Sequence, residues 1–209
     1  EKNITTVLLY RNRISKIELP FNADIEYLDL GDNSIREIEC LENVPNLKTL
    51  DLTYNCITEI KNLNLKYLEE LYLIANDIEK MSGLENLKNL KKLDLGCNEI
   101  EEIEGLDNLY LLEELYLGSN SIEKIENVKH MKLKIFAAQD NLLEEVDCRE
   151  LPKTLKELYL SENENLKEIK NLELLKDLEY LEIVKCKITE KDINLEILNK
   201  QLEIVDKNN

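Results

Sequence analysis

The stretch "LKKLDLGCNEI" at residues 90–100 places apolar residues at fixed distances from one asparagine. Leu90, Leu93 and Leu95 lie eight, five and three positions before Asn98, and Ile100 lies two positions after it. The Leu-x-Leu step alternates as a short strand does, because successive side chains of a strand point to opposite faces. We therefore expect a short strand here, with its leucines in a core and a turn at the asparagine.

The same frame recurs along the chain every 21 to 23 residues. The asparagine position holds in turn Asn12, Asn33, Asn55, Asn76, Asn98, Asn120, Asn141 and Asn163, and Cys186 in a ninth copy. The frame L-x-x-L-x-L-x-x-N-x-I resembles the leucine-rich repeat, in which each copy forms one coil of a solenoid. The resemblance implies a curved α/β leucine-rich repeat solenoid. Its parallel strands would line the concave face, and 3₁₀ or irregular turns the convex face.

No coil can enclose a core alone, so the leucines of neighbouring coils must stack on one another. We expect each repeated asparagine to satisfy backbone groups that the turn leaves without partners. No linker interrupts the repeats, which predicts a single domain of about nine repeats over residues 1–209. Within residues 190–209, the stretch "LEILNKQLEIVDKNN" at 195–209 is a candidate C-terminal cap made of a helix and a short strand. The longer interval between Asn163 and Cys186 predicts a bulged coil.

The composition excludes several classes of partner. The 209-residue chain carries a formal net charge of −17, and it lacks the clustered lysines and arginines that nucleic acids and anionic membranes require. Five cysteines without a C-x-x-C motif are typical of a reducing compartment, and no apolar run is long enough to span a membrane. We therefore expect an intracellular protein of the cytoplasm, the nucleus or both, with no nucleic acid or membrane partner.

Residues that support catalysis are scarce. His130 is the only histidine, and its place in "NVKHMKL" at 127–133 predicts an exposed position on the convex side. The cysteines fall in different repeats without metal-ligand spacing, and no glycine-rich phosphate-binding motif is present. Carboxylates are abundant, but no acid–base pair stands out. We expect no enzymatic activity, no cofactor and no bound metal.

The residue between the two strand leucines should point into the concave face. From Asp51 to Tyr116 this position alternates between acidic and aromatic residues. Tyrosine supplies a large contact area at low rotamer cost, and acidic neighbours favour a partner that carries lysine or arginine. The candidate partner-binding residues on this position and on the position two residues earlier are Asp51, Glu70, Tyr72, Asp94, Glu114, Tyr116, Glu157, Tyr159, Tyr180 and Glu182. A plainer interpretation stays open, because strands favour tyrosine and an acidic chain carries carboxylates everywhere.

Two consecutive repeats, "LKKLDLGCNEIEEIEGLDNL" at 90–109 and "LEELYLGSNSIEKIENV" at 112–128, resemble those of the protein phosphatase 1 regulatory subunit 7 family. Members of that family hold the phosphatase catalytic subunit on a concave row that alternates acidic and aromatic residues. The resemblance implies a non-catalytic regulatory subunit whose partner is the protein phosphatase 1 catalytic subunit. It places Asp51, Tyr72, Asp94 and Tyr116 in that row, and Glu157 with Tyr159 further along.

Other roles remain open for a solenoid of this kind. The first alternative is a scaffold for a cytoskeletal or ribonucleoprotein assembly, as in the dynein light chain and spliceosomal leucine-rich repeat proteins, which share the repeat without the acidic and aromatic row. A bacterial adhesin of the internalin type would need an export signal and a capping domain. A histone-binding acidic leucine-rich protein would need a long acidic tail.

Overall fold

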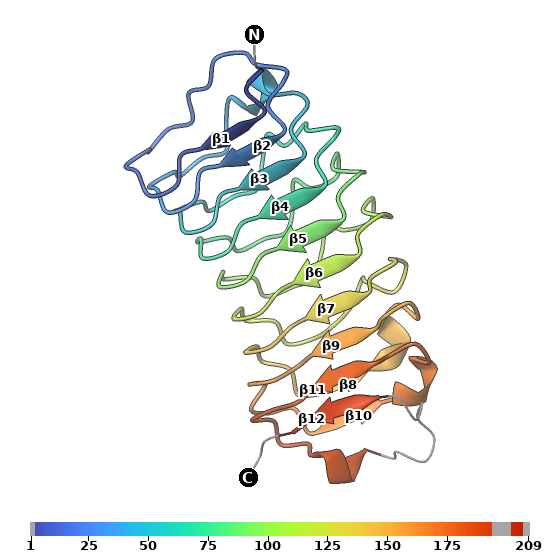
Figure 1. Cartoon of the computed structure of the whole chain (residues 1–209). Helices are drawn as coiled ribbons and strands as arrows, with labels where there is room; N and C mark the ends of the chain where they lie inside the picture. The colour runs from blue at the N-terminus through green and yellow to red at the C-terminus, as the bar shows by residue number, and fades with distance from the viewer. Residues whose placement is uncertain (1–2, 194–201, 207–209) are drawn as a thin grey trace.

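The computed structural model describes residues 3–193 and 202–206 as a ladder of short strands joined by turns (Figure 1). The strands are β1 (Thr6–Leu8), β2 (Tyr27–Asp29), β3 (Thr49–Asp51), β4 (Glu70–Tyr72), β5 (Lys92–Asp94), β6 (Glu114–Tyr116), β7 (Ile135–Ala137), β8 (Glu145–Asp147), β9 (Glu157–Tyr159), β10 (Glu168–Lys170), β11 (Tyr180–Glu182) and β12 (Glu203–Val205). Four 3₁₀ helices accompany them: η1 (Leu41–Asn43), η2 (Cys148–Glu150), η3 (Leu172–Leu174) and η4 (Glu190–Asp192).

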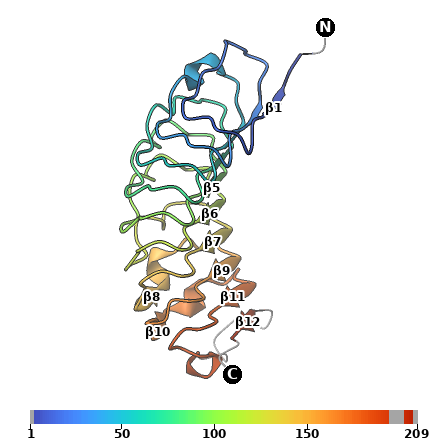
Figure 2. The same cartoon turned by 90° about the vertical axis from the view of Figure 1, so that its left-hand side faces the viewer.

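Ten of the strands form one parallel sheet in the order β1-β2-β3-β4-β5-β6-β7-β9-β11-β12. Each strand pairs with the strand of the next coil without a shift in register, as in Lys92 opposite Glu114 and Asp94 opposite Tyr116. Figure 2 shows β5, β6 and β7 set back relative to β1 and β12, so the sheet lines the inner side of a shallow curve. The predicted fold class, a curved leucine-rich repeat solenoid, is confirmed.

The core is a continuous stack of the repeated apolar positions. The middle residue of each strand from β3 to β6 is fully buried, namely Leu50, Leu71, Leu93 and Leu115. One hydrophobic cluster runs from Ile17 to Ile188. The apolar side chains of each coil pack against those of the coil before and the coil after. The strands are therefore held at a constant spacing and present a regular outer surface.

The repeated asparagines tie each coil to the previous one. The Asn98 side-chain amide donates hydrogen bonds to the carbonyls of Leu73 and Leu95, each at 3.0 Å, and its Oδ1 accepts one from the Ile78 amide at 3.1 Å. The same three-way pattern is seen at Asn33, Asn55, Asn76, Asn120, Asn141 and Asn163. The residue before each asparagine has a positive φ, and these bonds offset the strain of that turn.

The two ends of this asparagine ladder differ from its middle. Asn12 is exposed, and within the described residues its amide bonds only carbonyls of its own coil, those of Leu9 and Tyr10. At the other end the thiol of Cys186 donates to the Leu160 carbonyl at 3.2 Å, in the place of an asparagine amide. A thiol offers one weak donor where an amide offers two stronger ones.

The convex side departs from the prediction in the seventh and eighth coils. There β8 and β10 form a second, two-stranded parallel sheet on the side opposite β9 and β11 (Figure 2). The segment 168–170 pairs in register with 145–147, five residues after Asn163 against four after Asn141, so the extra residue predicted after Asn163 is accommodated before β10. Ion pairs between the coils, Lys167 with Glu144 at 2.9 Å and Lys170 with Glu145 at 2.6 Å, accompany this pairing. Elsewhere η1 and η3 and irregular turns occupy the convex side, as expected.

β12 lies within residues 190–209, where a C-terminal cap was predicted, and its capping role stays a prediction. β12 pairs with β11 and continues the main sheet by one strand. The expected cap helix falls mainly on residues 194–201, which lie outside the described residues. No helix in the described part of the chain has the length and apolar character needed to cross a bilayer.

Candidate protein-binding face

The outer surface of the main sheet consists of two straight columns of side chains. The first residue of each strand forms the Lys92 column: Thr6, Tyr27, Thr49, Glu70, Lys92, Glu114, Ile135, Glu157, Tyr180 and Glu203. The third residue forms the Asp94 column: Leu8, Asp29, Asp51, Tyr72, Asp94, Tyr116, Ala137, Tyr159, Glu182 and Val205. All ten candidate partner-binding residues lie on these columns, on the concave side. Their role in binding stays a prediction.

The aspartates of the Asp94 column are held by their own backbone. Oδ1 of Asp51 accepts a hydrogen bond from the Thr53 amide at 2.9 Å, and Oδ1 of Asp94 accepts one from the Gly96 amide at 3.1 Å. Burial raises the pKa of Asp94, while the Gly96 hydrogen bond opposes that rise. One carboxylate oxygen of each aspartate therefore stabilises the turn that follows the strand.

On β4 and β6 the tyrosine is paired with a glutamate two residues away on the same strand. The tyrosine hydroxyl donates to that glutamate at 3.1 Å in Tyr72–Glu70 and at 2.9 Å in Tyr116–Glu114. Burial and then the hydrogen bond to glutamate raise the pKa of both tyrosines well above the ordinary value. The hydroxyls thus stay protonated donors, and the rings are oriented before any partner arrives.

Lys92 lies between these two tyrosines. Its ammonium is 5.6 Å from the ring centroid of Tyr72 and 5.1 Å from that of Tyr116, and it forms an ion pair with Glu114 at 3.0 Å. A cation over an aromatic face is attracted by the ring quadrupole. The middle of the face is therefore a cluster in which one lysine is surrounded by aromatic and acidic groups.

A second aromatic and acidic cluster covers β9 and β11. The rings of Tyr159 and Tyr180 are 5.2 Å apart at a tilt of 43°. Tyr159 donates to Glu157 at 2.7 Å, and Tyr180 donates to Glu182 at 3.1 Å. Ser161 adds a hydrogen bond to Glu182 at 2.6 Å. The strand register brings all four predicted residues of this half into one patch.

The two clusters contain residues that sequence reasoning did not select. Lys92 and Ser161 both join the predicted acids, and Asp29 holds the Gly31 amide as the selected aspartates hold theirs. Lys92 could have been selected from the sequence, because it occupies the same strand position as the selected Glu70 and Glu114. Asp29 was visible in the alternating column, one coil before the selected row.

The structure offers little to a catalytic or metal-binding role. No group of three or more histidine, cysteine or acidic side chains in the described part of the chain is arranged to hold a metal ion. His130 is exposed, and its ring meets that of Tyr110 edge to face, with 6.3 Å between the centroids. No disulfide joins any of the five cysteines, all of which lie in described residues.

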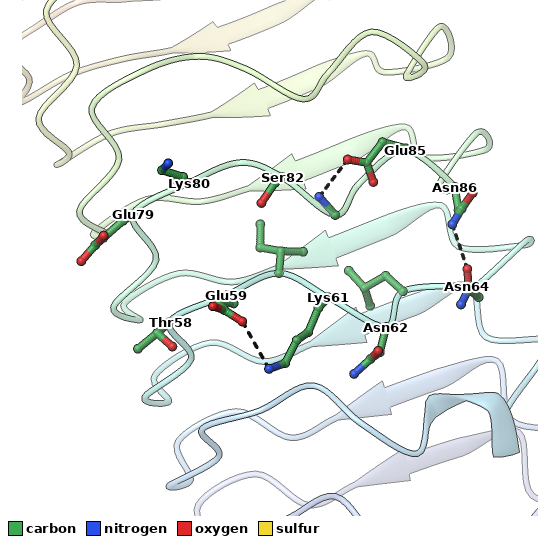
Figure 3. Close-up of a pocket in the computed structure, with 13 residues that line it drawn as sticks. Thr58, Glu59, Lys61, Asn62, Asn64, Glu79, Lys80, Ser82, Glu85 and Asn86 are labelled. Carbon is green, nitrogen blue, oxygen red and sulfur yellow. Dashed lines mark hydrogen bonds and ion pairs between the residues drawn. The ribbon is translucent and has the colours of Figure 1, made fainter.

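A hollow of about 670 Å³ opens on the side of the coils away from the main sheet, between the third and fourth coils (Figure 3). Its walls are polar: Lys61 bonds Glu59 at 3.2 Å, and Asn86 bonds Asn64 at 2.8 Å. The Gly83 amide donates to the carboxylate of Glu85 at 3.1 Å. These groups satisfy one another and include no nucleophile beside a base, so the hollow supplies no catalytic arrangement.

Comparison with known families identifies the repeat. The family described as Leucine Rich repeats (2 copies) matches residues 24–66, 45–86, 68–108 and 88–130, which together span residues 24–130 of the 209. A septation initiation network scaffold protein, cdc11 of Schizosaccharomyces pombe, is 36% identical over 63 residues. That match covers 29% of this chain and 6% of the yeast protein.

Solved structures show the same architecture. The internalin inlF of Listeria monocytogenes superposes with a TM-score of 0.71 at 25% sequence identity, over 97% of this chain and 66% of that one. Internalin C2 of the same bacterium gives a TM-score of 0.75 at 23% identity, over 88% of this chain and 81% of that one. With family matches over more than half of its length and the coil geometry described above, the chain belongs to the leucine-rich repeat family.

Proposed function

We propose that the protein is a non-catalytic regulatory or scaffold subunit that holds a protein phosphatase 1 catalytic subunit on its concave face. The fold is that of proteins that generally act as interaction scaffolds rather than as catalysts. The observation that carries the proposal is the row Asp51, Tyr72, Asp94 and Tyr116, which the strand register places side by side in alternation. The identity of the partner rests on the resemblance of the repeats to phosphatase regulatory subunit 7. The proposal places the protein inside the cell, in the cytoplasm or nucleus.

The contacts within the face suit it to binding. Ordering a flexible side chain at an interface costs about 0.5–1.5 kcal/mol, and the Tyr72 and Tyr116 hydroxyls are already held by glutamates. Buried or half-buried aromatic residues near the centre of an interface supply most of the binding free energy. The aspartates beside them are oriented by backbone amides. A partner with basic or amide groups would therefore meet a surface that needs little rearrangement.

The test is binding of the purified phosphatase catalytic subunit, measured by co-elution and by titration calorimetry. Tyr116→Ala should weaken the complex by about 2 kcal/mol, which is roughly a thirtyfold rise in Kd. Tyr116→Phe keeps the ring and should cost less. Tyr67→Ala is the matched control, because Tyr67 is exposed and lies just before β4, off both columns.

The proposal fails if the wild-type chain does not bind the catalytic subunit. If the chain binds but Tyr67→Ala weakens the complex as much as Tyr116→Ala does, the phosphatase partner stands and the concave face is wrong. The protein would then engage the phosphatase through the edges of its coils.

A scaffold role in a cytoskeletal or ribonucleoprotein assembly is the second candidate. The similarity to the septation initiation network scaffold cdc11 favours it, within the 63 residues matched. Such a partner need not use the acidic and aromatic row, and exposed apolar residues such as Tyr110 and Leu111 lie outside that row. Binding that is lost in Tyr110→Ala and kept in Tyr116→Ala would favour this role over the regulatory one.

A further inference from the structure

Lys92 shows that the concave face can bind a cationic side chain. Its ammonium contacts two tyrosine rings contributed by the coils on either side and pairs with Glu114. Both partners of the ion pair are about one third exposed, 29% for Lys92 and 34% for Glu114, so the cation is only partly surrounded by solvent. The chain thus supplies its own example of a cationic side chain bound by tyrosines and glutamates on this sheet.

The cluster on β9 and β11 is built from the same groups without the cation. Tyr159 and Tyr180 lie on adjacent strands, and each bonds a glutamate of its own strand. Among the described residues, neither Glu157 nor Glu182 has a lysine or arginine within ion-pair distance. Glu203 follows Tyr180 in the Lys92 column and adds a further negative charge.

We propose that Tyr159, Tyr180, Glu157 and Glu182 form a receptor site for a lysine or arginine side chain of a partner protein. Lys92 occupies a related site from within the chain, between Tyr72 and Tyr116 on the two strands beside its own, whereas the rings of Tyr159 and Tyr180 lie on adjacent strands and contact each other. The inference rests on the concave face being a protein-binding face, and it does not depend on the phosphatase as the partner. It assigns the C-terminal half of the face to recognition of a cationic side chain.

The geometry favours an organic cation over a metal ion. Two half-buried tyrosine rings lie beside two carboxylates, and a guanidinium or ammonium gains from both kinds of group. The tyrosine hydroxyls stay protonated, because burial and hydrogen bonds to the glutamates raise the pKa of Tyr159 and of Tyr180. No cluster of three metal-ligating side chains is found here or elsewhere in the described residues. An arginine can stack on a ring and form two hydrogen bonds to one carboxylate, so it fits best.

The experiment uses the whole chain with ¹³C-labelled tyrosine rings and two small probes. Nα-acetyl-arginine amide carries one guanidinium, and Nα-acetyl-citrulline amide has nearly the same shape without the charge. We expect saturable shifts of the Tyr159 and Tyr180 ring signals with the arginine probe alone. In a Glu157→Gln, Glu182→Gln double variant the Kd should rise roughly tenfold or more.

Lys92→Met tests the role of the internal cation. In that variant the rings of Tyr72 and Tyr116 should also respond to the arginine probe, because their site is then open. The proposal is overturned if the Tyr159 and Tyr180 signals do not shift, or if citrulline amide shifts them equally. It is also overturned if the glutamine variant, with an otherwise unchanged tyrosine spectrum, binds arginine as the wild type does.

These readouts are separate from the phosphatase titration. If the chain binds the arginine probe but not the phosphatase, this site is supported and the proposed partner is refuted. If the chain binds the phosphatase but the Tyr159 and Tyr180 ring signals do not shift with the probe, the partner is supported and this site is refuted.

Discussion

Removing one asparagine side-chain amide from the middle of the ladder should lower the free energy of unfolding of the solenoid by a predictable amount. In Asn98→Ala the Ile78 amide loses its acceptor, the Asn98 Oδ1 at 3.1 Å, and no other acceptor for it is seen in the described residues. The carbonyls of Leu73 and Leu95 each keep one side-chain hydrogen bond, Leu73 from the Asn76 amide and Leu95 from the Asn120 amide. One orphaned buried amide costs about 1–3 kcal/mol. The small cavity left by the amide adds to this, so we expect a loss of about 2–3 kcal/mol in the free energy of unfolding.

Asn12→Ala is the matched control at the open end of the ladder. Asn12 is exposed, and the structure shows no backbone amide bonded to its Oδ1 within the described residues. We therefore expect it to cost under about 1 kcal/mol. Urea unfolding followed by far-ultraviolet circular dichroism measures both variants, and hydrogen exchange at the Ile78 amide reports the local opening. Equal losses in the two variants, or undiminished protection of Ile78 in Asn98→Ala, would refute the reasoning.

Two further predictions concern the backbone and the buried thiols. Gly83 has a φ of +86°, and a methyl group added there would collide with the Ile60 carbonyl, so Gly83→Ala should cost about 2 kcal/mol or more. Gly96→Ala should cost less, because its methyl group would lie 3.3 Å from the Asp94 carboxylate and 3.4 Å from the Gly118 carbonyl, and comparison of the two melting temperatures checks this. Burial raises the pKa of Cys148 to about 12 and that of Cys186 to about 11, from 9.0. The unfolded chain loses these protons first, so stability should fall as the pH rises from about 9 to about 11, and a urea midpoint that increases over this range would contradict the assignment.

The main sheet could be predicted to the residue because one physical rule repeats. A Leu-x-Leu step with both leucines buried leaves a single choice for the side chain that faces outward, and the asparagine fixes where the strand ends. The tenth strand, β12, was expected only as part of a cap. Its pairing depends on the direction in which the chain returns from the last coil, which no repeat specifies.

The convex side could not be predicted so well. Residues 144–147 and 167–170, "EEVD" and "KEIK", each place one β-branched residue between charged ones, which is a weak signal for a strand that the stronger repeat pattern obscured. Whether two such segments pair depends on how closely the convex turns of adjacent coils approach each other. That spacing follows from the volumes packed inside the coils, including Phe136 beside Ala138 in the seventh, and it is not written in any one segment.

The sequence identified the residues of the face, but the contacts between their side chains could not be predicted from it. Composition suggested an evenly acidic surface, but Lys92 neutralises Glu114 at the centre while Glu157 and Glu182 have no cation beside them in the described structure. Charges that are already paired contribute little to steering, whereas unpaired carboxylates attract a basic partner over the Debye length. Asp51 and Glu70 on β3 and β4 likewise have no lysine or arginine within ion-pair distance in the described structure, so the unpaired carboxylates lie on both sides of the Lys92–Glu114 pair. Basic groups of a partner would thus be attracted to both halves of the face, and its apolar surface would meet Tyr72 and Tyr116 between them.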